Sequence, residues 1–148
     1  MMCSDDCIEL IKESEGFFSN PYTCPAGKAT IGFGSCFYDD GTPVTLEDDP
    51  INEDEAVALL HSTLIQYEEA VDRLVQVELT QGQFDALVDF TYNVGITAFK
   101  NSTMLKLLNK GDYEGAAGEF PKWVKGGGRT LPGLVKRRKR EMEMFNEA

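Results

Sequence analysis

The sequence predicts a small α+β protein, in which one N-terminal helix and a small sheet precede a mainly helical region. Three observations support this fold class. Residues 5–15 carry apolar side chains at helical spacing, and residues 17–44 are rich in aromatic, β-branched and turn-forming residues. After Asn52 the apolar residues recur at helical intervals for the rest of the chain.

The chain length predicts a single domain. Its 148 residues match the usual size of one domain, and two domains of half this length would each bury too little apolar surface. We therefore expect one domain over residues 1–148, with a sheet-bearing lobe at about 16–52. The helical lobe is expected at about 53–148 and also includes helix 5–15. A cleft between the lobes is the expected place for a ligand.

The first helix is predicted from the segment DDCIELIKESE, in which Ile8 and Ile11 fall on one face. Ser4 and the following aspartates suit a helix N-terminus, and Gly16 suits a helix end. The next segment, PYTCPAGKATIGFGSCFYDDGTPV, predicts short strands. Turn formers at 25–27 and 40–41 divide it, so we expect a small antiparallel sheet.

The remaining chain predicts several helices. One long helix is expected from about 53 to 75, and a second begins after Thr80 and ends at Gly95. The second helix is apolar enough to lie centrally in its lobe. Shorter helices are expected at about 101–109, 112–124 and 132–146, and the triple glycine at 126–128 is expected to form a surface loop.

The charge distribution excludes one class of function. The formal net charge is -11, whereas a sequence-independent nucleic-acid binder needs an excess of lysine and arginine to neutralise phosphates. We therefore expect no nucleic-acid partner. Eight of the 14 basic residues nevertheless lie between Lys122 and Arg140, which predicts an electrically two-faced molecule.

The chain also carries no recognisable membrane or export signal. No apolar run approaches the ~18 residues that a membrane helix needs, so we expect no stable membrane insertion. The four cysteines lie in the first quarter of the chain and cannot staple the whole molecule, which favours synthesis in a reducing compartment. They are Cys3, Cys7, Cys24 and Cys36.

Glu15 is the first candidate for catalysis. It ends the first predicted helix beside Gly16 and two phenylalanines, where partial burial would raise the pKa of its carboxyl group, as a general acid requires. A solvated glutamate at a helix end is the competing interpretation. Cys24 follows nine positions later, and Thr30 lies six positions beyond Cys24 and precedes IGFG. This spacing resembles the phage-type lysozymes, the endolysins of glycoside hydrolase family 24.

The resemblance extends over almost the whole chain. LIKESEGF is similar to the N-terminal helix of the family, and QFDALVDFTYNVGITAFKNSTMLKLLNKGDYEGAAGEF is similar to its central and following helices. Trp123 is similar to the family's tryptophan, and LPGLVKRRKREMEMF resembles its C-terminal helix. The resemblance implies a lysozyme-like fold and hydrolysis of the β-1,4 bond between N-acetylmuramic acid and N-acetylglucosamine in peptidoglycan, without a cofactor.

The resemblance also implies roles for single residues. Glu15 would be the general acid that protonates the glycosidic oxygen, and Thr30 would help to hold the attacking water. Cys24 stands where many relatives have aspartate, and cysteine is the family's second option at this position. A thiol of ordinary pKa, ~8.5, is mostly neutral at pH 7. Three roles therefore stay open for Cys24: thiolate base, nucleophile and water-positioning group.

Two further residues are candidates for substrate binding. Asn93 stands where the central helix of the family faces the cleft, although an asparagine at a helix end before a glycine is a common structural feature. Tyr92 is its neighbour, and a place in the core competes with a place in the cleft. We expect no metal site, because His61 is the only histidine and the cysteines have no standard ligand spacing.

The expected partner is bacterial peptidoglycan, and the expected state is a monomer. Synthesis in the host bacterial cytoplasm, with passage to the wall through a separate holin-type pore, would serve lysis of the host and phage release. The basic run 136–140 is then a solvated face, a surface attracted to the polyanionic wall, or a nucleic-acid patch. A disulfide that cages Cys24 is a further hypothesis.

Two rival functions belong to other classes. The first is a catalytically inactive peptidoglycan-binding or regulatory relative, in which the replacement of aspartate by Cys24 has removed activity. The second is a cysteine hydrolase that cleaves amide bonds, with Cys24 as nucleophile and His61 as base.

Overall fold

The computed structural model describes residues 1–147, which form two compact units. The hairpin unit comprises Glu9–Gln66, and the helical unit comprises Met1–Ile8 together with the chain from Tyr67 onward. Both boundaries fall inside helices, α1 (Asp5–Glu15) and α2 (Glu53–Leu74), rather than in a linker. The predicted helix 5–15 is confirmed, and the predicted long helix at 53–75 is confirmed to within one residue.

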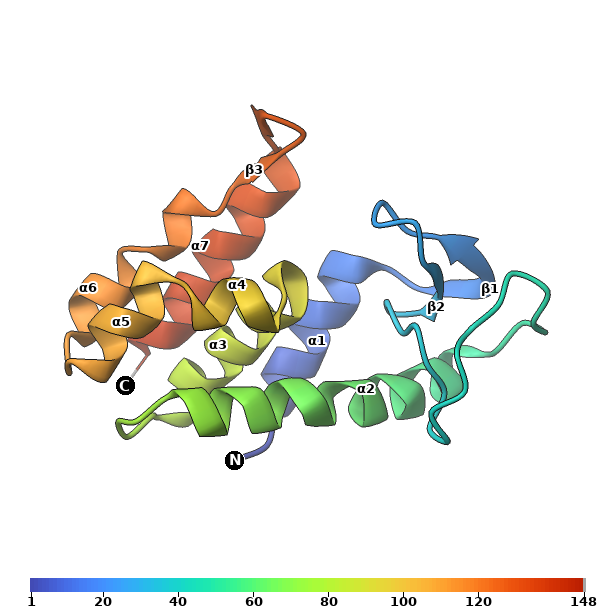
Figure 1. The fold of residues 1–148 in the computed structure, drawn as a ribbon, viewed down its shortest axis with the longest axis horizontal. Helices are drawn as coiled ribbons and strands as arrows, with labels where there is room; N and C mark the ends of the chain where they lie inside the picture. Colours follow the sequence, from blue (N-terminus) through green and yellow to red (C-terminus); the bar gives the residue numbers. More distant parts are fainter. Residues whose placement is uncertain (148) are drawn as a thin grey trace. The chain divides into compact units, whose positions relative to one another are not determined.

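The hairpin unit holds one antiparallel pair of strands, β1 (Phe18–Thr23) and β2 (Ala29–Gly32), which follows α1 in Figure 1. Tyr22 lies opposite Thr30 in the register, so their side chains share one face of the hairpin. The register shifts between Phe18 and Tyr22, which marks a bulge in β1. The predicted small antiparallel sheet is thus confirmed.

The turn between the two strands is closed by two backbone hydrogen bonds. The N–H of Cys24 donates to the carbonyl of Lys28 at 2.9 Å, and the N–H of Gly27 donates to the carbonyl of Cys24 at 2.8 Å. Pro25 favours the first central position of such a turn, and Gly27 adopts φ 82°, which favours glycine. Cys24 therefore sits where β1 ends and the turn begins.

A small apolar core supports the hairpin from within its own unit. Ile31 of β2 is fully buried and packs in one cluster with Val44 and Leu59. Phe33 is also buried, and its ring lies 5.6 Å from that of Phe17. Because Ile31 directly follows Thr30, this core fixes the strand that carries Thr30.

The helical unit consists mainly of short helices around a central one, α3 (Gln81–Val94). Thr80 caps α3 through a capping box with Gln83, and α3 packs most extensively against α7 (Pro132–Asn146). The predicted central helix is thus confirmed. The other elements are α4 (Ile96–Lys100), α5 (Thr103–Asn109), α6 (Tyr113–Ala117), the 3₁₀ helix η1 (Phe120–Lys122), β3 (Lys125–Gly126) and β4 (Arg129–Thr130).

Aromatic packing anchors these short helices. The ring of Phe90, fully buried in α3, meets those of Phe99, Phe120 and Trp123 edge-to-face, with centroids 5.2–6.3 Å apart.

Within residues 1–147, no helix combines the length and the apolar character needed to cross a membrane.

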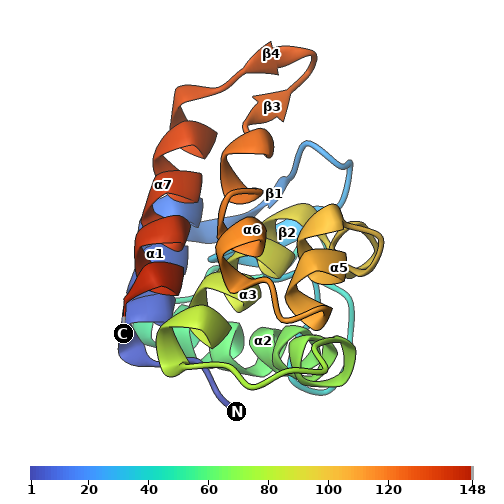
Figure 2. The ribbon, with the colours of Figure 1, turned by 90° about the vertical axis from the view of Figure 1, so that its left-hand side faces the viewer.

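Two predictions for this unit are wrong in detail. The expected helix at 112–124 is α6 followed by η1, because Gly118 weakens the helix and Pro121 lacks the N–H that would continue it. The expected loop at 126–128 belongs to the β3–β4 hairpin, which precedes α7 in the chain and lies at the top of Figure 2. Gly127 and Gly128 have φ of 59° and 80°, the positive pair that a tight hairpin turn requires.

The basic run at 136–140 is not a uniformly solvated face. Arg137 and Arg138 are buried, whereas Lys136 and Lys139 are exposed. Arg137 makes a two-pronged ion pair with Asp89 of α3, with N···O distances of 3.0 and 2.8 Å. This pair ties α7 to the central helix, so part of the run serves the core rather than a surface.

A second buried pair lies next to it. Nε of Arg138 is 2.7 Å from Oε1 of Glu141. Burial and a hydrogen bond with Asp89 raise the pKa of Glu141. Burial opposes a charge on Asp89 as well, but the hydrogen bond from Glu141 and the Arg137 guanidinium outweigh it and lower the pKa of Asp89. The two carboxyl groups therefore titrate as a coupled pair, in which Glu141 keeps its proton to a higher pH than Asp89 does.

Two glycines at the second position of their helices offer a matched test of the α3–α7 packing. A methyl group at Gly82 of α3 would overlap the carbonyl oxygen of Met144 in α7, whereas one at Gly133 would meet nothing within 4 Å. We expect Gly82→Ala to lower the free energy of unfolding by ~1–3 kcal/mol, because the packed helices must separate. Gly133→Ala should raise it by ~0.5–1 kcal/mol, as alanine does in an open helix. Urea unfolding of both variants measures this, and equal effects would contradict the close packing at Gly82.

Candidate active site

Three of the five predicted site residues lie in the hairpin unit. Glu15 is the last residue of α1, Cys24 begins the β1–β2 turn, and Thr30 is the second residue of β2. Glu15 and Cys24 are partly buried, and Thr30 is only 2% exposed. The hairpin register and the turn thus position Cys24 and Thr30 through backbone hydrogen bonds.

The Thr30 hydroxyl lies among several acceptors. It donates to the carbonyl of Lys28 at 3.0 Å and lies 3.7 Å from the sulfur of Cys36. It is also within hydrogen-bonding reach of the sulfur of Cys24.

Cys24 is a free thiol in a local environment that favours the thiolate. The backbone of Lys28 and the nearby hydroxyl of Thr30 favour the charged form of the sulfur, and together they lower the pKa of Cys24. Desolvation acts in the opposite direction but is outweighed. The turn therefore gives this thiol more negative charge at neutral pH than an ordinary cysteine has.

Tyr22 shows that the acidic groups of the hairpin unit converge. Burial raises the pKa of its phenol, and the negative charges of Glu15, Cys24 and Cys36 raise it further. The phenol therefore lies within electrostatic range of all three groups. Tyr22 and Cys36 were not predicted as site neighbours. The alternation of side chains along β1 puts Tyr22 on the same face as Cys24, and this feature of the sequence could have predicted Tyr22 as a neighbour.

The other two predicted residues lie in the helical unit, on the last turn of α3. Asn93 is exposed, and its Oδ1 accepts a hydrogen bond of 2.7 Å from the Arg138 guanidinium. Tyr92 is partly buried, and its ring meets that of Tyr67 edge-to-face with the centroids 5.1 Å apart. Asn93 thus presents a fixed amide, whereas Tyr92 is packed on one side by an aromatic ring.

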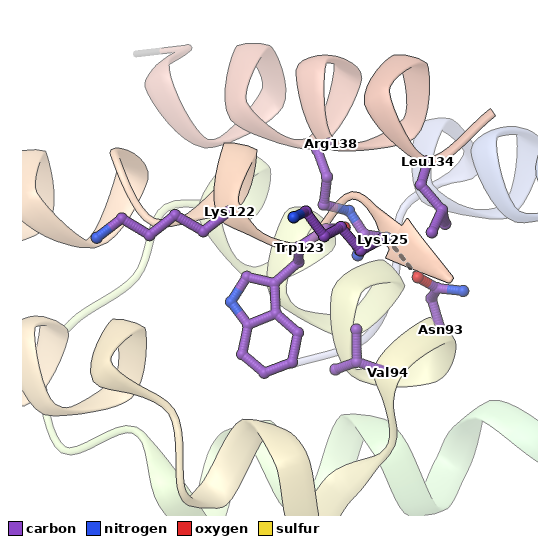
Figure 3. Close-up of a pocket in the computed structure, with 7 residues that line it drawn as sticks. All are labelled: Asn93, Val94, Lys122, Trp123, Lys125, Leu134 and Arg138. Carbon is purple, nitrogen blue, oxygen red and sulfur yellow. Dashed lines mark hydrogen bonds between the residues drawn. The ribbon is translucent and has the colours of Figure 1, made fainter. Parts of the chain in front are cut away.

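Asn93 borders a pocket of about 390 Å³ in the helical unit, shown in Figure 3. Three cationic side chains and one indole ring contribute to its wall, and none of the seven lining residues is acidic. Figure 3 shows the hydrogen bond from Arg138 holding the oxygen of the Asn93 amide. The lining residues are Asn93, Val94, Lys122, Trp123, Lys125, Leu134 and Arg138.

The structure offers little for a cysteine hydrolase. Its proposed base, His61, is exposed on α2, and the hydrogen bonds that lower the pKa of Cys24 come from Lys28 and Thr30 instead.

One group of possible metal ligands occurs among residues 1–147, namely Cys3, Cys7 and Asp85 in the helical unit. The carboxylate of Asp85 already accepts three hydrogen bonds there, from the backbone and hydroxyl of Ser4 and from Gln81.

Comparison with known proteins assigns the family. The phage lysozyme family matches residues 12–141. The endolysin of Acyrthosiphon pisum secondary endosymbiont phage 1 is 41% identical over the whole length of both chains. The endolysin of Bacillus phage B103 is 44% identical over 98% of this chain, which spans only 54% of that longer protein.

A solved structure agrees with this result. The muramidase domain of SpmX from Asticaccaulis excentricus superposes with a TM-score of 0.87 at 36% identity, covering 98% of this chain and 97% of that one. The predicted lysozyme-like α+β fold is confirmed, as is the resemblance in the sequence on which it was based. The chain belongs to the phage lysozyme family, whose members are lysozyme-type glycoside hydrolases.

Proposed function

We propose that the protein cleaves the β-1,4 bond between N-acetylmuramic acid and N-acetylglucosamine in bacterial peptidoglycan, and so lyses the host cell and releases phage. Membership of the phage lysozyme family and the full-length endolysin relative support this activity. The observation that carries the proposal is the place of Cys24 at the β1–β2 turn, where its N–H and the Thr30 hydroxyl both donate to the Lys28 carbonyl, in the unit that also holds Glu15.

Glu15 acts as the general acid in this proposal. Its carboxyl group protonates the glycosidic oxygen as the bond to the leaving sugar breaks. Its place at the end of α1, partly buried and near the phenol of Tyr22, keeps it in a mixed polar and apolar environment.

Cys24 acts as the base. Its thiolate, stabilised by the Lys28 N–H and the Thr30 hydroxyl, takes a proton from the water that attacks the anomeric carbon. Thr30 positions this water and the sulfur relative to each other. A family aspartate is charged at neutral pH without assistance, whereas a thiol needs these donors to reach a similar charge.

Asn93 and Tyr92 bind the sugar chain. Because Arg138 occupies the amide oxygen of Asn93, the amide NH₂ group is left to donate to a carbonyl or hydroxyl oxygen of the substrate. Tyr92, packed against Tyr67 on one side, supplies an aromatic edge or face for the sugar on the other. No cofactor or metal enters the reaction, and both units act as one catalytic domain.

The route to the wall follows from the same proposal. The protein is made as a monomer in the bacterial cytoplasm and reaches the wall through a separate holin-type pore. The exposed lysines at 136 and 139 are attracted to the polyanionic wall rather than to nucleic acid. Expression in bacteria with and without a co-expressed pore protein tests this route, since rapid lysis without the pore would show that the chain exports itself.

One assay separates the proposed activity from its rivals. Purified peptidoglycan is incubated with the protein, and the products are tested for new reducing ends and for new amino groups. A glycosidase releases reducing ends only, an amide hydrolase releases amino groups, and a binding protein releases neither. The anomeric form of the released sugar separates a water-activating Cys24, which inverts it, from a covalent nucleophile, which retains it.

The role of Glu15 predicts the outcome of a conservative substitution. Glu15→Gln should reduce release of reducing sugars by about 10²–10⁴-fold, because the amide cannot donate the proton. The melting temperature should change little. Glu13→Gln, an exposed position on the same helix turn, is the matched control and should keep near-normal activity. Near-normal activity of Glu15→Gln would refute the assignment.

The role of Cys24 predicts a pH profile. If the thiolate is the base, activity falls as the pH drops through the pKa of Cys24, which lies below the ordinary thiol value. Cys24→Asp should keep much of the activity and move this acidic limb down toward ~4, the ordinary range of a carboxyl group. Cys24→Ser should lose most activity at every pH.

The measurement is kcat/KM against pH for the wild type and both variants. Cys3→Ser, which removes a thiol in the helical unit, is the matched control and should leave the profile unchanged. A fully active Cys24→Ser enzyme would show that the thiol has no chemical role.

A further inference from the structure

The first four residues are held against the helical unit by a series of polar contacts. The N-terminal ammonium group pairs with Asp72 at 2.9 Å, and the N–H of Cys3 donates to the carboxylate of Glu68 at 2.7 Å. The N–H and hydroxyl of Ser4 both donate to Asp85. These bonds reach α2 and α3, so the position of Cys3 is fixed before α1 begins.

This arrangement brings two thiols together. The sulfur atoms of Cys3 and Cys7 are 3.2 Å apart, and the thiol of Cys7 also faces the backbone carbonyl of Asp85 at 3.5 Å. The two residues are four apart across the first turn of α1, since the N–H of Ile8 already donates to the carbonyl of Ser4. The contact between the two sulfur atoms shows that the two side chains already point toward each other.

We propose that Cys3 and Cys7 form a dithiol that closes to an intramolecular disulfide when the protein meets a small-molecule disulfide oxidant such as oxidised glutathione. The sulfurs must approach only from 3.2 Å to the ~2.05 Å of a disulfide bond. Rotation of the two side chains supplies this movement while the backbone contacts of the first four residues stay in place. The proposal does not depend on the enzymatic activity.

The reaction proceeds in two exchange steps. Cys3, which is partly exposed, attacks one sulfur of oxidised glutathione, and the released glutathione thiolate takes the proton from Cys3. Cys7, which is fully buried, then attacks the Cys3 sulfur of the mixed disulfide, and the second glutathione leaves with the Cys7 proton. Two electrons pass from the protein thiols to the oxidant, which yields two molecules of reduced glutathione.

The surroundings keep the Cys7 thiol neutral, so its attack on the mixed disulfide is the slow step of closure. The hydrogen bond from Cys7 to Cys3, burial, and the nearby charges of Asp89 and Asp85 raise the pKa of Cys7. Closure removes the Cys7 thiol, which cannot easily ionise, and leaves no hydrogen-bond donor without an acceptor. The Asp85 carbonyl lies in α3, where a helical N–H already bonds it. Closure also withdraws two of the three cysteines that could otherwise cage Cys24.

The test is oxidation of the full chain in glutathione buffers, followed by alkylation and peptide mapping without reductant. Cleavage before Asp5 or Asp6 separates Cys3 from Cys7, so the two peptides stay joined only through the disulfide. We expect Cys3 and Cys7 to lose their thiols together. Half-closure should require a proportion of oxidised glutathione at least about tenfold below that which half-modifies Cys36, because the two thiols are already positioned.

Two variants keep the outcome interpretable. In Cys7→Ala, Cys3 should stop at the mixed disulfide with glutathione, and in Cys3→Ser the buried Cys7 should stay unmodified. Cys36→Ala is the matched control and should close the Cys3–Cys7 pair like the wild type. A stable glutathione adduct on Cys3 of the wild type, or a disulfide from Cys7 to Cys24 or Cys36, would overturn the proposal.

Discussion

The candidate catalytic centre depends on the pairing of Cys24 with Lys28 across the β1–β2 turn. The backbone bond from Cys24 to Lys28 closes the turn, and the N–H of Lys28 points back to the Cys24 sulfur. Thr30, two residues further along β2, adds its hydroxyl from the buried side. The turn places the backbone of Lys28, and the core residue Ile31 holds the strand that carries Thr30. A side chain alone could not impose this arrangement on a short exposed turn.

The helical unit rests on a different constraint, the buried charged groups of α7 and their partners on α3. Arg137 holds Asp89, and Arg138 holds Glu141 while reaching Asn93 at the end of α3. Buried charges are costly unless each finds a partner, so the register of α7 along α3 is strongly specified. The same network fixes which atom of the Asn93 amide faces outward. The stability of the unit and the orientation of the Asn93 amide thus depend on one set of contacts.

Most of the fold could be predicted from the sequence, because local signals and helical periodicity agree over long segments. The helix at 5–15, the long helix after Asn52 and the capped helix after Thr80 all have both an apolar face and an end signal. Short elements were less predictable. The segment at 112–124 mixes helix-forming residues with Gly118 and Pro121, and the structure divides it there into α6 and η1. The burial of Arg137 and Arg138 could not be predicted either, because a run of five basic residues resembles a surface patch until its partners on α3 are known.

The candidate site could likewise be predicted from the sequence only in part. The spacing of Glu15, Cys24 and Thr30 was visible in the sequence, whereas the donors that act on Cys24 and the neighbouring Tyr22 depend on strand register. This explains why a thiol at a position of aspartate need not mean loss of activity. A carboxylate carries its charge at neutral pH in almost any polar surrounding, but a thiolate must be stabilised locally. The turn supplies that stabilisation through two donors, so the chemistry at position 24 is set by the hairpin as much as by the residue that occupies it.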